Sequence, residues 1–220
     1  MKNYLSIVVP IREGSVRVKN KNLRRFNKKN LLIYKILKLK KLKKVDNIII
    51  NTDSIEAIKI AKKMRVSYFK RQKYFASSKC SNSSFWQNIA KTTPSDYIMF
   101  TNCTSPLLSV KTYQSIIDKY LKIKNNYGSI NTVTPLKEYI YHNNKPLNFN
   151  ASKAPKSQNI KKTFKLNFAV NIISNKEMYK KKSLISNKPF FFELDEIEGF
   201  DIDTMVDFKI AEFLYKNKFK

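Results

Sequence analysis

The chain contains little glycine, cysteine or histidine and no long apolar run. Of its 220 residues, three are Gly, two are Cys and one is His. The two cysteines have no metal-ligand spacing, which argues against a disulfide framework or a zinc site. No segment approaches the ~18 apolar residues of a membrane-spanning helix. The apolar run in the opening MKNYLSIVVPIRE is too short for a signal peptide, so we expect a cytoplasmic protein with no membrane partner.

Apolar content is nevertheless high enough for a folded domain. Hydrophobic residues make up 42% of the chain and aromatic residues 13%. Disordered chains are much poorer in such residues. A chain of 220 residues has the length of one large domain, so we expect a single domain over residues 1–220.

The charge is strongly positive, with 44 basic residues against 16 acidic ones and a net charge of +28. This balance suggests nucleic-acid binding, but only six of the basic residues are arginine. Arginine is the side chain that reads bases and grips phosphates with two parallel donors. Codon usage rich in A and T also produces much Lys, Asn and Ile, so we do not expect nucleic acid as a partner.

Half of the acidic residues lie close to the C-terminus. Eight of the sixteen fall between Glu193 and Glu212, where Lys209 is the only base, so this window carries a charge of −7. An acidic cluster inside a basic chain is typical of a site for a divalent cation.

Strand and helix patterns alternate along the chain. Continuous apolar or alternating runs predict strands at 4–10, 46–51, 66–69, 96–101, 129–134, 167–173, 190–192 and 198–202. Helical spacing predicts helices at 30–44, 54–65, 82–92, 109–123 and 204–218, with Thr52 or Asp53 and Ser109 as candidate caps. Such alternation predicts an α/β fold of three layers, with a mainly parallel sheet covered on both faces. Ligands of these sheets bind beyond the carboxyl ends of the strands.

The pattern breaks between residues 135 and 166. This stretch has three prolines, several asparagines and no helical period. Connections of this length inside a compact domain are often lids or arms. We therefore expect residues 135–166 to form an inserted dimerisation or substrate arm.

A basic loop with one glycine follows the first strand, from Pro10 to Asn22. It lacks the GxxxxGK spacing of a Walker loop. Exposed backbone N–H groups and cationic side chains at such a place suit a triphosphate, although a solvated basic turn explains the same residues. Gly14 and Gly199 lie beside the two charged segments, and in a chain with three glycines we expect both to meet a backbone requirement.

Two aspartates near the C-terminus, Asp201 and Asp203, alternate about Ile202. On an extended segment, residues i and i+2 lie on one face, where two carboxylates can hold a magnesium ion and phosphate oxygens. Helix capping by Asp203 or Thr204, with Asp207 in the first turn, is the other explanation. The segment Asn102–Leu107 after the fourth strand suits hydrogen bonding to a nucleotide or a sugar, or forms an ordinary turn.

Six segments follow one another in a recognisable order. They are the loop with Arg12, Gly14, Ser15, Lys21 and Asn22; Thr52-Asp53-Ser54; Arg71–Ala76; Cys103–Leu107; Asn167–Asn171; and Asp201–Phe208. In this order, and at nearly matching intervals, they resemble the motifs of the acylneuraminate cytidylyltransferases, the CMP–sialic acid synthetase family.

The resemblance implies a Rossmann-like nucleotidyltransferase in which CTP and a 2-keto sugar acid give the CMP-sugar and pyrophosphate. It also implies Mg²⁺ or Mn²⁺ as cofactor and a homodimer. Catalytic roles then fall to Arg12, Arg17, Lys21 and Asp203; nucleotide binding to Arg12, Gly14, Ser15, Lys21, Asn22, Arg71, Asn102, Thr104 and Ser105; sugar binding to Lys156, Gln158, Lys165 and Asn167; and metal binding to Asp201 and Asp203.

Three positions depart from the family pattern. Val16 stands where the family has a lysine, but the related 3-deoxy-manno-octulosonate (Kdo) cytidylyltransferases resemble an arrangement with arginine one place later, so Arg17 is a candidate replacement. Phe168 stands where the family has glycine and should reshape the sugar pocket. The arginine expected near Lys156 is a lysine, which loses the bidentate grip on a carboxylate.

Several functions therefore stay open at this point. The acceptor could be sialic, legionaminic or pseudaminic acid, or the enzyme could be a CMP-Kdo-type synthetase. A glycosyltransferase with a DxD motif and a basic binding protein without catalysis are further alternatives. We interpret Trp86 as a core residue.

Overall fold

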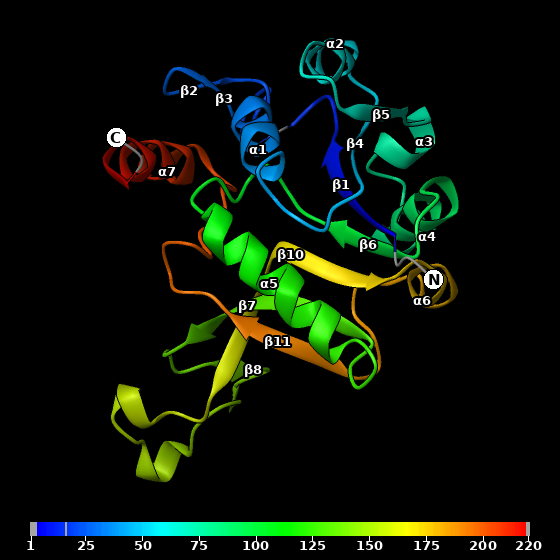
Figure 1. Cartoon of the computed structure of the whole chain (residues 1–220). Coiled ribbons are helices and arrows are strands. Elements are labelled where there is room, and N and C mark those ends of the chain that lie inside the picture. Colours follow the sequence, from blue (N-terminus) through cyan, green and yellow to red (C-terminus); the bar gives the residue numbers. More distant parts are fainter. Residues whose placement is uncertain (1–3, 16, 219–220) are drawn as a thin grey trace.

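The computed structural model describes residues 4–15 and 17–218, which form one seven-stranded sheet flanked by helices (Figure 1). The strand order is β11-β7-β10-β6-β1-β4-β5. The strands span Leu5–Ile11 (β1), Asn47–Thr52 (β4), Ser67–Lys70 (β5), Tyr97–Phe100 (β6), Ser129–Leu136 (β7), Thr163–Ser174 (β10) and Pro189–Glu193 (β11).

Six of these strands run in one direction and β10 runs against them. The pairs β1–β4, β1–β6, β4–β5 and β7–β11 are parallel, whereas β10 pairs antiparallel with both β6 and β7. The central strand β1 is nearly uninterrupted in apolar residues and buried along its length, as expected for a strand covered on both faces. The prediction of an α/β fold with a mainly parallel sheet is confirmed.

Helices cover the sheet on its two faces. They span Leu31–Leu39 (α1), Ile55–Lys63 (α2), Lys73–Ala76 (α3), Asn82–Thr92 (α4), Val110–Ile123 (α5), Asn175–Lys181 (α6) and Met205–Lys218 (α7). One large apolar cluster includes residues of α1, α2, α5 and α7, and a smaller one includes residues of α4 and α6. The sequence pattern missed α3 and α6, which are short.

Helix ends follow local capping chemistry. Ser109 accepts a hydrogen bond from the Thr112 backbone at the start of α5, as predicted. Helix α2 is capped by Ser54 and not by Thr52 or Asp53, because Ser54 is the residue whose hydroxyl accepts from the Ala57 backbone. Helix α1 ends at Leu39, five residues before the predicted end at 44, and looser turns follow it.

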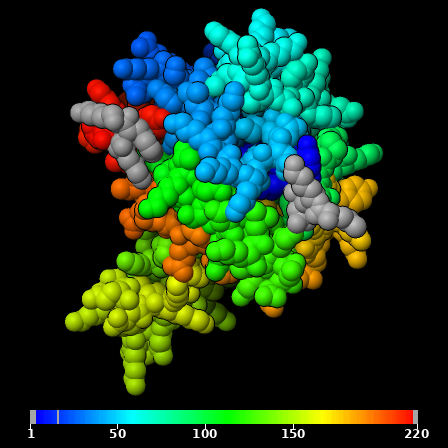
Figure 2. Space-filling model, in the orientation of Figure 1, coloured from blue at the N-terminus to red at the C-terminus, as the bar shows by residue number. Residues whose placement is uncertain are grey.

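The segment between β7 and β10 projects from the body as an arm (Figures 1 and 2). It contains the short hairpin of β8 (Tyr141–His142) and β9 (Lys145–Pro146) and two short 3-10 turns. The rings of Tyr139 and Tyr141 pack against Phe149, and Asn148 bonds to the backbone of residues 138 and 140. Its role in dimerisation stays a prediction. A second short hairpin pairs β2 (Arg25–Phe26) with β3 (Lys29–Asn30).

The strand predicted at 198–202 is wrong. Residues 195–200 turn back on themselves through backbone bonds from Gly199 to Asp195 and from Phe200 to Ile197, so no ladder forms. A Cβ at Gly199 would lie 2.3 Å from the Thr134 hydroxyl oxygen, which explains the glycine by close approach. Gly14 has a φ of +80°, so its backbone requirement is a left-handed turn.

None of the helices within residues 4–15 and 17–218 has the length and apolar content needed to cross a bilayer.

Candidate functional site

Two neighbouring pockets lie at the carboxyl ends of the strands. The first, called here the basic pocket, has a volume of about 350 Å³. Its polar lining comes from the loop after β1, the end of β5, the start of α4 and the end of β6: Arg12, Ser15, Arg17, Lys21, Asn22, Arg71, Asn82 and Asn102. Seven of these eight residues are among the sequence-predicted site residues. The folded chain therefore gathers six of the nine predicted nucleotide-binding residues, together with Arg17, on one cavity.

The second pocket, called here the acidic pocket, has a volume of about 460 Å³. It is lined by the residues before α7, the end of β7 and one residue of β10, including Asp201, Asp203 and Lys165. The sequence reasoning placed the two aspartates on a strand. They lie instead on an extended segment that runs into α7, and both still line this one pocket.

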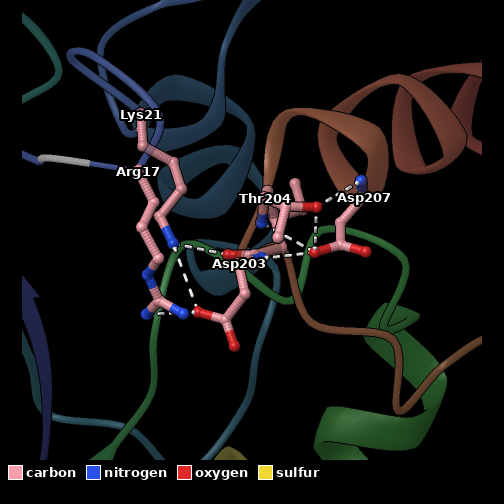
Figure 3. A network of polar contacts seen from close by, with 6 residues as sticks. Arg17, Lys21, Asp203, Thr204 and Asp207 are labelled. Atoms are coloured by element: carbon pink, nitrogen blue, oxygen red, sulfur yellow. Dashed lines mark hydrogen bonds and ion pairs between the residues drawn. The ribbon is translucent and has the colours of Figure 1, made fainter.

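Ion pairs join the two pockets (Figure 3). The Arg17 guanidinium lies 2.9 Å from a carboxylate oxygen of Asp203, and the Lys21 ammonium lies 3.9 Å from the same oxygen. Lys21 also donates to the backbone carbonyl of Ile202, a residue 181 positions away in the chain. The two charged segments, found separately in the sequence, thus meet at Asp203.

Burial affects the charged groups at this junction. It lowers the pKa of Lys21, while the neighbouring Asp201 and Asp203 carboxylates act in the opposite direction. Burial raises the pKa of Asp201, against hydrogen bonding from the Thr104 side chain, which lowers it. The ionised form of Asp201 is therefore incompletely compensated, and a cation bound nearby would stabilise it.

Asp201 and Asp203 fit a hard divalent cation. The Oδ1 atom of Asp201 is buried and has no hydrogen-bond partner among the described residues. Within the described part of the chain, no three His, Cys, Asp or Glu side chains gather at one point. A pair of carboxylates suits Mg²⁺, which keeps several waters and takes its other ligands from phosphate oxygens.

Asp207 and Thr204 serve the start of α7 (Figure 3). One carboxylate oxygen of Asp207 accepts from the backbone N–H groups of Asp203 and Thr204, at 3.1 and 2.7 Å. The Thr204 hydroxyl accepts from the Asp207 backbone in return, which makes a capping box. Thr204 and Asp207 therefore cap helix α7, as one of the two sequence interpretations predicted. The carboxylate of Asp203 does not take part in the cap and pairs with Arg17 and Lys21.

Arg71 is almost fully buried at the floor of the basic pocket. Its guanidinium donates to the side-chain and backbone oxygens of Asn51, at 2.7 and 2.6 Å, and stacks on the Phe85 ring at 4.4 Å. Burial lowers its pKa to about 10, so it stays charged at neutral pH. Asn22, beside it in the pocket lining, has a buried Oδ1 with no hydrogen-bond partner in the described residues.

The loop after β6 is held from below by buried lysines of α1. The ammonium of Lys35, which is 2% exposed, donates to the Tyr113 hydroxyl and to the Ser105 carbonyl. Lys38 donates to the carbonyls of Pro106 and Leu108, at 2.6 and 2.9 Å. The sequence reasoning missed both lysines, because nothing in a lysine-rich chain distinguishes a buried lysine from an exposed one.

This bracing fixes the positions of the predicted loop residues. Asn102 lines the basic pocket, whereas Thr104 and Ser105 line neither pocket. The Thr104 carbonyl instead accepts from the Ile202 backbone at 2.9 Å, and Ser105 is buried. The loop therefore supports the aspartate segment more than it faces a ligand.

The predicted sugar-binding residues are separated in space. Lys165 lines the acidic pocket. Asn167 is buried and bonds to Thr132, Thr134 and the Ala169 backbone. Lys156 and Gln158 are exposed on the arm and line neither of the two pockets. Val16 lies outside the described residues.

An aromatic wall closes the other side of the basic pocket. It consists of the apolar residues Phe85, Trp86, Phe100, Phe168 and Leu184. Trp86 packs against the smaller apolar cluster, as expected for a core residue, but it also lines the basic pocket. The departure of Phe168 from the family motif was the only signal in the sequence for this wall.

The arrangement combines three features that phosphoryl transfer needs. Cations in the basic pocket can neutralise a polyphosphate, two carboxylates beside it can hold a divalent cation, and the acidic pocket leaves space for a second substrate.

Comparison with known proteins agrees with this chemistry. Residues 6–219 match the family model described as Cytidylyltransferase. The chain is 26% identical over 94% of its length, and 93% of the relative, to the CMP-N,N'-diacetyllegionaminic acid synthase of Campylobacter jejuni subsp. jejuni. It is 25% identical over 98% of its length, and 97% of the relative, to a pseudaminic acid cytidylyltransferase of the same subspecies.

A solved structure shares the fold. The CMP:2-keto-3-deoxy-manno-octonic acid synthetase in complex with CTP superposes with a TM-score of 0.72, covering 98% of this chain and all of that one. The sequence identity is 12%, so this likeness concerns the fold alone.

We predict that Lys35→Ala destabilises the protein by about 2–4 kcal/mol, because it removes buried packing and the donor to the Ser105 carbonyl, and leaves the Tyr113 hydroxyl with only its contact to Thr101. Lys35→Met, which keeps the length of the side chain, should cost about 1–3 kcal/mol from the lost hydrogen bonds alone. Urea unfolding measures both changes. The exposed Lys41→Ala is the control and should stay within about 0.5 kcal/mol of wild type. If Lys35→Met is as stable as wild type, the ammonium does not hold the loop.

Proposed function

The chain belongs to the cytidylyltransferase family, and from this premise we propose that it transfers CMP from CTP to the anomeric hydroxyl of a nonulosonic acid, with release of pyrophosphate. Nonulosonic acids are nine-carbon 2-keto sugar acids. One observation carries the proposal: the cations of the loop after β1 and the aspartates before α7 meet at the Arg17–Asp203 contact of 2.9 Å.

In the proposed reaction the triphosphate lies in the basic pocket. Arg12, Arg17 and Lys21 place positive charge where the β- and γ-phosphates bind, and Asn22 and Arg71 hold the nucleoside side of the ligand. The acceptor hydroxyl attacks the α-phosphate, and the bond from this phosphorus to the bridging oxygen of the β-phosphate breaks. Charge then develops on the leaving pyrophosphate, where the same cations stabilise it.

Asp201 and Asp203 are the proposed holders of Mg²⁺ or Mn²⁺, which would neutralise phosphate oxygens and orient both substrates. Asp203 is exposed on the pocket side, so its carboxylate is also placed to receive the acceptor proton. Both aspartates need the Ile202 backbone bonds to Lys21 and Thr104 to keep their place.

The contact between Arg17 and Asp203 has to open during the reaction. Both side chains are more than half exposed, at 68% and 51%, so the pair is weak and easily exchanged. A triphosphate attracts Arg17, and a divalent cation attracts Asp203. We propose that Arg17 takes the place of the lysine that the family carries at position 16.

The acceptor carboxylate is proposed to bind Lys165, which lines the acidic pocket. Lys156 and Gln158 on the arm can contribute only if the arm reaches a pocket, and a homodimer that exchanges arms would bring them to the partner's site. The names of the two relatives support legionaminic or pseudaminic acid as the acceptor class. Because CTP is made and used in the cytoplasm, we propose a cytoplasmic location.

A pyrophosphate-release screen tests the proposed function. The full chain is incubated with Mg²⁺, CTP and a panel of 2-keto sugar acids that includes nonulosonic acids and the eight-carbon Kdo. ATP, GTP and UTP serve as nucleotide controls. We expect release only with CTP and at least one nonulosonic acid. No release with any acid contradicts the proposal, and preferred turnover of Kdo would favour the CMP-Kdo-type synthetase.

We predict that Asp203→Asn lowers kcat by about 10²–10³-fold or more, because the neutral amide holds a divalent cation poorly and takes no proton. The unfolding midpoint should change little, since the side chain is half exposed. Pyrophosphate release and urea unfolding give the two measurements, with the exposed Glu56→Gln on α2 as the matched control. Near-normal turnover would rule out the metal assignment.

We predict that Arg17→Ala lowers kcat/KM for CTP by about 10²-fold, the effect of losing one charged donor on the transferred group. Lys19→Ala is the control, because Lys19 is an exposed cation of the same loop that does not line the basic pocket. Steady-state kinetics at varied CTP measure the change. Equal effects of the two substitutions would mean that general loop charge, and not Arg17, is what matters.

We predict a homodimer that buries the arm. Tyr141 and Leu147 on the arm are 58% and 60% exposed in the single chain, which is unusual for large apolar side chains on a short hairpin. Light scattering should give twice the mass of 25.9 kDa, and Leu147→Asp should shift the protein toward monomer. A monomeric wild type at working concentration would contradict the prediction.

A further inference from the structure

Phe168 adopts a backbone conformation that aromatic residues rarely take. Its φ is +52°, in the left-handed region. The other described non-glycine residues with positive φ are asparagine, lysine or arginine, so Phe168 is the one aromatic residue among them. Bulky side chains in this region are strained, and such strain persists mainly where a function or the surrounding structure requires it.

The strain lies at a bulge in β10. The register between β10 and β7 shifts between Leu166 and Asn171. The neighbouring Asn167 fixes this bulge, because its Oδ1 accepts from the Thr132 hydroxyl and from the Ala169 backbone. Gly199 packs against the same asparagine. The bulge turns Phe168 into the lining of the basic pocket.

The apolar side of that pocket is built from elements other than the cationic side. The cations come from the loop after β1 and from the end of β5, whereas most of the apolar lining comes from α4, β6, β10 and the segment after α6; Pro10 and Val18 are the apolar lining residues on the cationic side. In the sheet, β6 and β10 lie on one side of β1, and β4 and β5 lie on the other. The two linings meet where Arg71 stacks on Phe85 at 4.4 Å, and away from this contact the loop after β1 suits phosphates while Phe168 and Leu184 suit an apolar group.

The wall lies on the same side as the proposed acceptor residues. Strand β10 carries both Lys165, in the acidic pocket, and Phe168, in the basic pocket. Three residues of regular strand span about 10 Å, and the bulge at Phe168 shortens this distance. An acceptor with its carboxylate on Lys165 and its anomeric hydroxyl near Asp203 can therefore extend its far end toward Phe168.

We propose that Phe168, together with Trp86 and Leu184, recognises apolar substituents on the acceptor, namely the methyl groups of N-acyl chains and of a deoxy terminal carbon. This inference rests on the proposed function and deepens it, because it names the residues of this chain that would select an N-acylated deoxy sugar acid over a polyhydroxylated one. Phe168 is a specificity-determining residue in this assignment.

Desolvation gives the physical reason for selection. A hydroxyl placed against Phe168 and Leu184 loses its hydrogen bonds to water and gains none from these two side chains. A methyl group at the same place is removed from water at no such cost. One apolar contact of this size changes kcat/KM about 10- to 200-fold, which is enough to separate two related acids.

The test compares two acceptors on variants of position 168. N,N'-diacetyllegionaminic acid carries two N-acetyl groups and a terminal methyl, and N-acetylneuraminic acid carries one N-acetyl group and a hydroxylated tail. Wild type should prefer the first, by kcat/KM, by about 10-fold or more. Phe168→Asn, which tolerates a positive φ and makes the wall polar, should reduce this preference about 10-fold, while KM for CTP changes less than about twofold.

Two further variants separate strain from recognition. Phe168→Gly and Phe168→Ala both remove the ring, but only glycine relieves the positive φ. Both should lose acceptor preference equally, and the glycine variant should melt at the higher temperature. Arg65→Gly is the control, because it relieves an equal φ of +52° at an exposed position after α2, far along the sheet from β10. It should leave both the acceptor preference and the KM for CTP unchanged.

Each other outcome has a distinct meaning. If wild type turns over neither acid nor any other 2-keto sugar acid, the proposed function fails. If wild type turns over both acids without preference, or if Phe168→Asn keeps the preference, the inference is overturned while the proposed function stands. A large rise in KM for CTP with unchanged acceptor preference would assign the wall to the nucleobase and also overturn the inference.

Discussion

The arrangement of the site depends on one set of ion pairs, in which the cations of Arg17 and Lys21 contact the carboxylate of Asp203. These side chains come from opposite ends of the chain, and Lys21 secures the junction by donating to the Ile202 carbonyl. Each partner alone would be a solvated charge of little consequence. Together they place positive charge directly beside carboxylates, and the proposed nucleotidyl transfer needs this juxtaposition for the phosphates and a divalent cation.

Buried polar contacts under the loops keep this junction in place. Lys35 and Lys38 bring cationic groups into the interior to hold the loop after β6, and that loop in turn holds Ile202 through Thr104. Burying an ammonium group costs free energy unless its hydrogen bonds are satisfied. The hydrogen bonds that satisfy Lys35 and Lys38 also hold the loop in one geometry. The bulge in β10 works in the same way: Asn167 and Gly199 stabilise a backbone that puts the strained Phe168 into the pocket wall. Desolvation of the buried ammonium groups and the positive φ of Phe168 lower the stability of the fold, and the same groups hold the side chains of the site in place before a ligand binds.

Much of the site could be read from residue types and their order. The basic loop and the two aspartates were found because cations, carboxylates and a rare glycine are conspicuous in their surroundings. Asn102 was found because small polar residues follow a predicted strand, and Arg71 only through the ordered motifs that indicated the family. The structure assembles most of them on two adjoining pockets. Lys156 and Gln158 stand apart on the arm, and Thr104, Ser105 and Asn167 support the site from beneath.

Residue patterns alone predicted the α/β class, the long strands and helices, and the basic or acidic character of the segments near the two ends of the chain, because hydrophobic periodicity and local charge are properties of neighbouring residues. The folded chain was needed to show that residues 195–200 form a turn and that no strand follows at 201–202, that Trp86 faces a pocket, and that two lysines of α1 are buried. It also showed that Phe168, expected at the sugar pocket, lines the basic pocket. These features depend on contacts between residues distant in the chain, such as Gly199 with Thr134 and Lys35 with Ser105, and local patterns carry no information about such contacts.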